Sequence, residues 1–304
     1  MSNRDFLLLE DAVPLYLEEY LAARNSPPLT RTAYRRDLTE AVLFLLDPCG
    51  LVAVSQVEER HLERFLGELD RRGLSGSYRR RKVAAIRSFF SFLTRRGFLP
   101  ESPAAALIPP ERELPQLRYL SKEEYTRLRA AVAKEPRDAA VIELLLQTGM
   151  LLSEVSRLKL TDVELPETIS QEPGNVGRAR IVRGKARKDR TVTLNWKACQ
   201  AISSYLAVRR RDTDDPSLFL NRSRRRLGPR AIERLVAKHL KTAGIHGASV
   251  HSLRHTFGTH QVIKGTALQT IEETLGNVQG SDATAQYVDL ARQEMDRQLQ
   301  EGAL

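Results

Sequence analysis

The most informative segment of this 304-residue chain is His251-Ser252-Leu253-Arg254-His255-Thr256-Phe257. Tyr287 follows it, 33 residues after Arg254. His251 and Arg254 are three residues apart, so on a helix they share one face and contact the same anion. A guanidinium clamps two phosphate oxygens, and a neighbouring imidazole binds the same phosphate or takes a proton from a nucleophile. Tyr287 adds a candidate nucleophile, provided that positive charges activate a phenol whose ordinary pKa is about 10. This set predicts phosphodiester chemistry.

The composition indicates a polyanionic partner, because the formal net charge is +10 and the sequence pI is about 9.8. A membrane surface also attracts such charge. However, no apolar run approaches the ~20 residues of a spanning helix, and the first residues lack the apolar core of a signal peptide. Only Cys49 and Cys199 occur, without a CxxC, so we expect neither a disulfide framework nor a zinc site. A soluble, cytoplasmic protein of two domains is predicted.

The positive charge is concentrated in three clusters. Residues 71–100 hold nine basic and no acidic residues, residues 178–190 hold seven and one, and residues 209–241 hold eleven and four. A single charge run is usually a solvated face, but three arginine-rich clusters favour a surface that follows phosphates. The residues predicted to contact DNA are Arg79, Arg80, Arg81, Lys82, Arg87, Lys188, Arg190, Arg224, Arg225, Arg230 and Arg234.

The first hundred residues predict four helices, placed by apolar periodicity, proline and glycine stops and Ser/Thr caps. The first three are expected at 10–24, 30–46 and 57–72, and the fourth begins near Ser75 or Ser77 and ends before Gly97. The basic residues 79–82 fall in the first turns of the fourth helix, where we expect them opposite its apolar stripe. This arrangement is typical of a helix that lies against a nucleic-acid backbone.

A proline-rich connector separates the first domain from the second. Residues 100–118 contain five prolines and little periodicity, which indicates a stiff, extended segment. A capping box, Ser121 with Glu124, then opens a second, mostly helical domain. Alternation in residues 179–182 and 191–194 predicts two short strands joined by the basic turn 184–190. Further helices are expected at 121–134, 138–148, 197–211, 229–243, 251–263, 267–275 and 289–299.

Four motifs in this order resemble the tyrosine recombinases, the phage integrase family. They are Thr148-Gly149-Met150-Leu151-Leu152-Ser153-Glu154, the turn Gly184-Lys185-Ala186-Arg187-Lys188-Asp189-Arg190, His251-x-x-Arg254-His255-Thr256, and Tyr287. Arg87–Leu93 and Ser102-Pro103-Ala104 resemble the family's core-binding domain, and the length is most like the Xer-type and small integrases. The resemblance implies a mainly α fold: a four-helix, SAM-like core-binding domain at 1–108, a linker at 109–118, and a catalytic domain with a small antiparallel sheet at 119–304.

The resemblance also implies a mechanism. Tyr287 would attack a phosphate of double-stranded DNA, forming a 3′-phosphotyrosyl bond, while Lys185 protonates the leaving 5′ oxygen. Arg254 would stabilise the non-bridging oxygens, with help from His251. The covalent intermediate keeps the bond energy, so no ATP, metal or cofactor is implied. Four protomers, or this chain with a second recombinase, would act together, with residues 289–304 docking on a neighbour or packing in their own domain.

Two positions depart from the family pattern. Leu151 stands where the family has the second arginine of its phosphate clamp, and Asn277 stands where it usually has histidine or tryptophan. Loss of one such electrostatic contact lowers the rate by ~10²–10³-fold, whereas an amide still donates to phosphate. Three explanations stay open: compensation by Arg178, Arg180 or Arg183, a slow partner-dependent recombinase, or a catalytically impaired DNA-binding accessory or regulator. A type IB topoisomerase is a weaker alternative.

Overall fold

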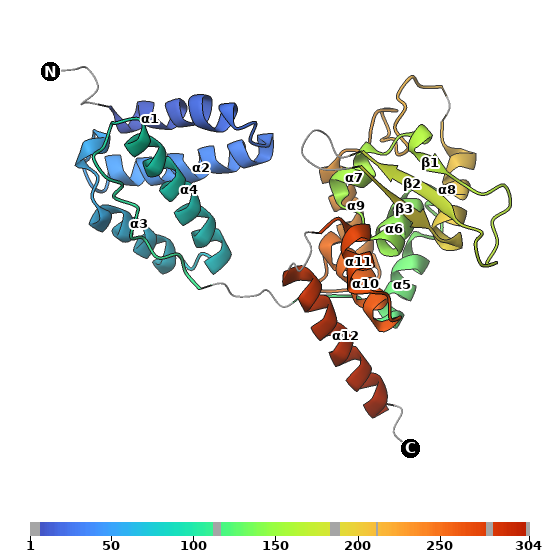
Figure 1. Cartoon of the computed structure of the whole chain (residues 1–304). Helices are drawn as coiled ribbons and strands as arrows, with labels where there is room; N and C mark the ends of the chain where they lie inside the picture. Colours follow the sequence, from blue (N-terminus) through green and yellow to red (C-terminus); the bar gives the residue numbers. More distant parts are fainter. Residues whose placement is uncertain (1–6, 112–116, 183–188, 211, 278–281, 302–304) are drawn as a thin grey trace. The chain divides into compact units, whose positions relative to one another are not determined.

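The computed structural model (Figure 1) describes residues 7–111, 117–182, 189–210, 212–277 and 282–301. The chain divides into two compact units, an N-terminal unit of residues 1–115 and a C-terminal unit of residues 116–304. This division falls inside the segment 109–118, which the sequence predicts to be the linker. No helix in the described part of the chain is long and apolar enough to cross a membrane.

The N-terminal unit is helical, as predicted. Its core contains Tyr16, Phe65, Phe89 and Phe90, all buried, and the Tyr16 hydroxyl lies 2.7 Å from Ser88 Oγ. The second helix begins earlier than predicted, because a proline at its first position needs no hydrogen-bond partner for a backbone N–H. The elements are α1 (Leu9–Leu15), the π-helical turn η1 (Tyr16–Leu21), α2 (Pro28–Leu46), η2 (Val54–Gln56), α3 (Glu59–Arg71) and α4 (Gly76–Arg95).

The C-terminal unit surrounds α6, whose apolar side chains are buried almost all round, with helices and one small sheet. Its helices are α5 (Lys122–Val132), α6 (Pro136–Thr148), α7 (Leu152–Arg157), α8 (Trp196–Val208), α9 (Pro229–Thr242), α10 (Val250–Ile263), α11 (Leu268–Leu275) and α12 (Asp282–Glu301), with a short 3-10 turn, η3 (Leu160–Asp162). Ser121 caps α5 as predicted, since its side chain accepts from the Glu124 N–H. The mainly α fold with a small antiparallel sheet is confirmed.

The sheet has three antiparallel strands in the order β1 (Val163–Glu164), β2 (Gly177–Ile181) and β3 (Arg190–Leu194). Ala179 pairs with Val192, so the predicted alternation places these side chains in the core. Arg178 and Arg180 point to the exposed face of β2. The sequence predicts β2 and β3 but misses the two-residue β1.

Tyr287 lies inside α12, so the prediction that this helix begins near residue 289 is wrong. The helix begins at Asp282, and Tyr287, Leu290, Ala291 and Glu294 are buried along one face of it. These residues are three or four positions apart, so they form one face of the helix, and α12 packs against α10. The apolar face therefore starts at Tyr287 itself.

Candidate active site

Arg254 lies in α10, and three oxygen atoms hold its guanidinium. Nη1 donates to the Gly149 carbonyl at 2.6 Å, and Nη2 donates to the Leu275 carbonyl at 3.1 Å and to Asn277 Oδ1 at 2.8 Å. Only 9% of the residue is exposed, and burial lowers its pKa, although a guanidinium stays charged at neutral pH. The group is therefore a fixed positive charge at the end of α6 and α11.

Gly149 makes this arrangement possible. It ends α6 with a φ of +62°, in the left-handed region that favours glycine. A Cβ at this position would lie 2.5 Å from Leu275 Cδ2 and 2.8 Å from Phe257 Cδ1. The Thr148-Gly149 motif thus brings a backbone carbonyl to Arg254 where no side chain fits.

Asn277 leaves one hydrogen-bond donor unused. Its Oδ1 accepts from Arg254, whereas its Nδ2 is buried and has no partner among the described residues. A buried amide nitrogen without a hydrogen-bond partner is unfavourable. A ligand that brings a hydrogen-bond acceptor to Nδ2 would remove this cost. A phosphate oxygen beside Arg254 would be such an acceptor.

Tyr287 faces α10, and only 1% of it is exposed. Its hydroxyl lies 3.4 Å from His255 Nδ1, and its ring packs so closely on Gly258 that a Cβ there would lie 2.8 Å from Cδ2. Burial raises the pKa of the phenol, while the charge of Arg254 and a hydrogen bond from it act in the opposite direction. The structure thus brings together Arg254 and Tyr287, two of the residues that the sequence predicts to be catalytic.

His251 and His255, two of the three histidines of this helix, differ in their surroundings. His251 is exposed in the first turn of α10. Burial, with the nearby charges of His251 and Arg254, lowers the pKa of His255 to about 4. The sequence prediction missed His255 as a site residue. Its position next to Arg254, and four residues after His251 on the same helical face, is the signal that could have found it.

Leu151 is the first residue before α7, and its side chain is partly exposed. Its N–H donates to Glu154 Oε2 at 2.9 Å. The same carboxylate binds the Arg190 guanidinium at 2.6 and 2.9 Å, and Arg190 Nε donates to the Thr274 carbonyl at 2.8 Å. Arg190 was predicted to contact DNA, but its donors are committed inside the protein, so we withdraw it from that set.

Two of the three predicted substitutes for the missing clamp arginine lie elsewhere. Arg178 and Arg180 are on the solvent face of β2, and Arg180 pairs with Asp162 at 3.5 Å. Arg190, which the sequence did not suggest for this role, lies near Arg254. Burial is the largest effect that lowers the pKa of Arg254; the charge of Arg190 also lowers it, but its ion-pair partner Glu154 raises it by more. The predicted residues Arg183, Lys185 and Lys188 lie outside the described residues.

Lys82 is buried, so the prediction that it contacts DNA is wrong. Its ammonium is fully buried, 2.7 Å from Glu40 Oε2 and 3.3 Å from Asp37 Oδ1. A buried ammonium with two carboxylate partners cannot reach a phosphate. It ties α4 to α2.

The arginines of α4 remain nearer the surface. Arg87 is exposed, and Arg79, Arg80 and Arg81 are partly exposed. All four have partners in their own unit. Arg79 pairs with Asp70, and Arg81 pairs with Asp37 and lies over the Tyr78 ring. Arg80 donates to the Pro110 carbonyl, and Arg87 donates to the Ala105 carbonyl.

A second basic surface belongs to the C-terminal unit. Arg230 and Arg234 are exposed on α9, whose apolar residues Ile232, Leu235 and Val236 are buried. Arg224 and Arg225 are exposed in the turn before α9. The backbone of Arg224 has a φ of +59°, and its side chain pairs with Asp212 at 2.7 Å.

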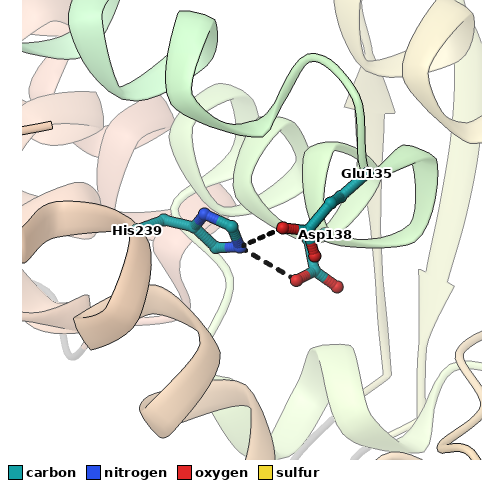
Figure 2. Close-up of side chains that lie close together, drawn as sticks. All are labelled: Glu135, Asp138 and His239. Carbon is teal, nitrogen blue, oxygen red and sulfur yellow. Dashed lines mark hydrogen bonds and ion pairs between the residues drawn. The ribbon is translucent and has the colours of Figure 1, made fainter. Parts of the chain in front are cut away.

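One group of described side chains has the composition of a cation site: Glu135, Asp138 and His239 (Figure 2). His239 Nε2 lies 2.9 Å from Asp138 Oδ2 and 4.0 Å from Glu135 Oε1. Arg137 and Lys238 bind the same two carboxylates at 2.8 and 2.9 Å. Because these two cations already neutralise the carboxylates, we interpret the group as a polar tie between α6 and α9.

Comparisons with known proteins agree with this geometry. Residues 118–294 match the family model described as Phage integrase family, and residues 13–97 match Phage integrase, N-terminal SAM-like domain. The tyrosine recombinase XerC of Pelobacter propionicus is 34% identical over 272 residues, which cover 88% of this chain and 85% of that protein. XerC of Thermodesulfovibrio yellowstonii is 32% identical over 291 residues, covering 91% and 89%.

Solved structures show the same fold. The XerA recombinase aligns with a TM-score of 0.53 at 27% identity, covering 95% of this chain and 98% of that one. The XerH site-specific recombinase, bound to its palindromic difH substrate after cleavage, aligns with a TM-score of 0.73 at 21% identity, covering 91% and 80%.

A helical unit with basic residues on α4, joined to a unit that groups arginine with tyrosine, defines a tyrosine-type DNA strand transferase. The chain belongs to the phage integrase family, the tyrosine recombinases.

Proposed function

We propose that this site-specific recombinase cuts and rejoins DNA with Tyr287 as nucleophile, through a 3′-phosphotyrosyl intermediate that frees a 5′-hydroxyl. The observation that carries the proposal is the pairing of Arg254 with Tyr287, which opposes the rise in the phenol's pKa on burial. A fixed guanidinium favours the phenolate and binds the phosphate that the phenolate attacks.

Around this pair, the other residues take the following roles. The free Nδ2 of Asn277 donates to a non-bridging phosphate oxygen. Exposed His251 binds the same phosphate from the first turn of α10. Lys185, in the turn between β2 and β3, protonates the leaving 5′ oxygen.

Leu151 does not abolish catalysis in this proposal. The clamp keeps one arginine and gains an amide donor from Asn277, and the Arg190–Glu154 ion pair lies beside it. Electrostatic preorganisation depends on where the donors lie rather than on which residue supplies them. We therefore propose an active enzyme that is slower than one with two clamp arginines.

DNA binding is assigned to two surfaces. The arginines of α4 contact phosphates from the N-terminal unit, and those of α9 and its preceding turn contact them from the C-terminal unit. Lys188, in the β2–β3 turn, would add a further phosphate contact.

We propose that the chain works as an oligomer on DNA, as a tetramer of its own or together with a second recombinase. The first turns of α12 pack in their own domain, whereas Met295 and Leu299 near its end are 41% and 74% exposed. Lambda integrase was solved as a dimer on a core site and as a tetramer on a Holliday junction. Apolar side chains at the end of α12 suit docking on a neighbouring protomer.

The test uses a library of nicked suicide duplexes with a randomised central segment. Adducts that resist denaturation are isolated and their DNA is sequenced, for wild type, Tyr287→Phe and Leu151→Arg. We expect an adduct at one sequence with wild type and none with Tyr287→Phe. An adduct only with Leu151→Arg would instead indicate a DNA-binding accessory, and wild-type adducts at many sequences would indicate a topoisomerase.

A further inference from the structure

We infer that His255 is a further catalytic residue, whose Nδ1 accepts the phenol proton of Tyr287 while the phenol oxygen attacks phosphorus. The inference rests on the proposed function, since it assigns the proton acceptor for the same nucleophile.

The geometry of α10 places this acceptor beside the nucleophile. The phenol oxygen lies 3.4 Å from His255 Nδ1, and the two ring centroids are 5.8 Å apart with an interplanar angle of 50°. Catalytic hydrogen bonds are often long before the substrate is bound. Gly258, one turn further along, lets the phenol ring approach the helix.

Among the described residues, the phenol has hydrogen-bond contacts with His255 and Arg254. A guanidinium has no lone pair to accept a proton, so Arg254 can only donate. His255 is therefore the group in contact with the phenol that can receive its proton. His251 lies exposed in the first turn of the helix, where it suits phosphate binding.

The environment keeps this imidazole ready to accept. Burial, with the nearby charges of His251 and Arg254, lowers the pKa of His255 to about 4, so the ring is uncharged at neutral pH. In the tautomer that carries its proton on Nε2, Nδ1 has a free lone pair that faces the phenol. Such a weak base does not deprotonate a resting phenol. A phenol oxygen that is forming a bond to phosphorus is far more acidic, so the proton moves only as attack proceeds. The bound phosphate, an anion near the imidazole, also raises the pKa of His255.

The step balances as follows. The phenol O–H proton passes to Nδ1, the phenol oxygen bonds to phosphorus, and the bond from phosphorus to the 5′ oxygen breaks. That oxygen leaves as a hydroxyl with a proton from Lys185. In rejoining, the 5′-hydroxyl attacks phosphorus, and His255 returns its proton to the departing phenol oxygen.

The experiment measures single-turnover cleavage of the duplex selected above. His255→Asn keeps an acceptor oxygen near the position of Nδ1 but has no basic nitrogen, so we expect a rate about 100-fold lower, within the range of general base catalysis. His260→Asn is the matched control, because His260 lies on the same helix with its ring 5.8 Å from that of Tyr125. The control should cleave like wild type, and both variants should bind the duplex normally.

A substrate with sulfur in place of the bridging 5′ oxygen separates the two proton transfers. A thiolate leaves without protonation, so this substrate should restore Lys185→Ala but not His255→Asn. Free imidazole should restore His255→Ala, which a purely structural role does not predict.

Equal cleavage by His255→Asn and wild type would overturn the assignment. Rescue of His255→Asn by the sulfur substrate would also overturn it, because that result would place His255 at the leaving group. Loss of folding in His255→Asn, together with failure of free imidazole to rescue His255→Ala, would overturn it as well. Absence of any wild-type adduct would refute the proposed function itself. An adduct at the wild-type rate in His255→Asn would refute only the role of His255.

Discussion

In the proposed mechanism, the side chain at position 151 determines how much positive charge faces the phosphate. Leu151 is partly exposed, and its backbone N–H is fixed by Glu154, so a longer side chain can enter the site without disturbing α7. We expect Leu151→Arg to raise the single-turnover cleavage rate by ~10-fold to ~10²-fold, near the lower limit for one electrostatic contact. An unchanged rate would show that the charge of Arg190 already fulfils this function.

Lys82 allows a prediction about stability and pH. Lys82→Met leaves Asp37 and Glu40 without their ammonium partner, and loss of one member of a buried pair costs about 3–5 kcal/mol. We expect the free energy of unfolding at pH 7 to fall by about 3 kcal/mol, measured by denaturant unfolding of the full chain.

The sign of the pH effect follows from Glu40. Burial raises its pKa, but hydrogen bonds and charge from Lys82, with Arg72 and Tyr78, leave it lowered. In wild type the ionised Glu40 carboxylate stabilises the fold at pH values above its unfolded-state pKa. This stabilisation is lost as the pH falls through its folded-state pKa. Without Lys82 its lowering of the Glu40 pKa is absent, so the folded pKa lies closer to the unfolded one and this contribution is smaller. The difference between Lys82→Met and wild type should therefore shrink at pH 4. A difference that stays constant with pH would contradict this account.

At the level of elements, α10 and α12 meet at Gly258. Gly258→Ala places a methyl group 2.8 Å from the Tyr287 ring, so the ring has to move away from α10. We expect the pKa of Tyr287 to fall toward 10 as the phenol becomes exposed, followed by NMR of labelled tyrosines with Tyr287→Phe for assignment. Overpacking of this kind also costs about 1–3 kcal/mol of stability. An unshifted titration would mean that the helix, rather than the ring, gives way.

The arginines of α9 make a second prediction for an element. Arg230→Ala should weaken DNA binding at low salt and reduce the dependence of affinity on salt by about one phosphate contact. Arg60→Ala is the control, because Arg60 is an exposed arginine on α3 that pairs with Glu58. A salt dependence equal to that of wild type would remove α9 from the interface.

Local signals made most elements predictable. The Ser121–Glu124 capping box and the alternation in β2 and β3 depend on residues a few positions apart, and the structure has them as expected. The strand β1 has only two residues and forms by pairing with β2, so no local pattern marks it. The start of α12 was missed because Tyr287 was interpreted as a nucleophile rather than also as the first apolar contact of a helix.

The site was predictable in its residue types but less so in its partners. The spacing of Arg254 and Tyr287 indicated both residues, and α10 brings them together. Lys82 and Arg190 were placed wrongly because acidic partners more than 30 residues away in sequence bind them, and charge patterning does not reveal such pairs. The free amide of Asn277 likewise depends on the position that Arg254 gives it.

At the scale of the whole molecule, we propose that the end of α12 docks on a neighbouring protomer. Leu299→Asp replaces an exposed apolar side chain, so we expect single-protomer binding to DNA to persist and higher assemblies to be lost. Gln300→Asp adds the same charge at the next position without removing an apolar group and serves as control. Sedimentation of the protein–DNA complexes distinguishes single-protomer binding from higher assemblies. Equal assembly by both variants would show that docking does not use Leu299.

The burial of Tyr287 also has a consequence for how the protein searches for its site. A protomer that slides along unrelated sequence keeps its phenol out of contact with the backbone phosphates, since only 1% of the residue is exposed. With Tyr287 as the proposed nucleophile, this burial would suppress accidental nicking during the search. The first cut at a true site must therefore begin with an uncovering step, and this step should appear as a lag that grows shorter when the protein is assembled on DNA in advance.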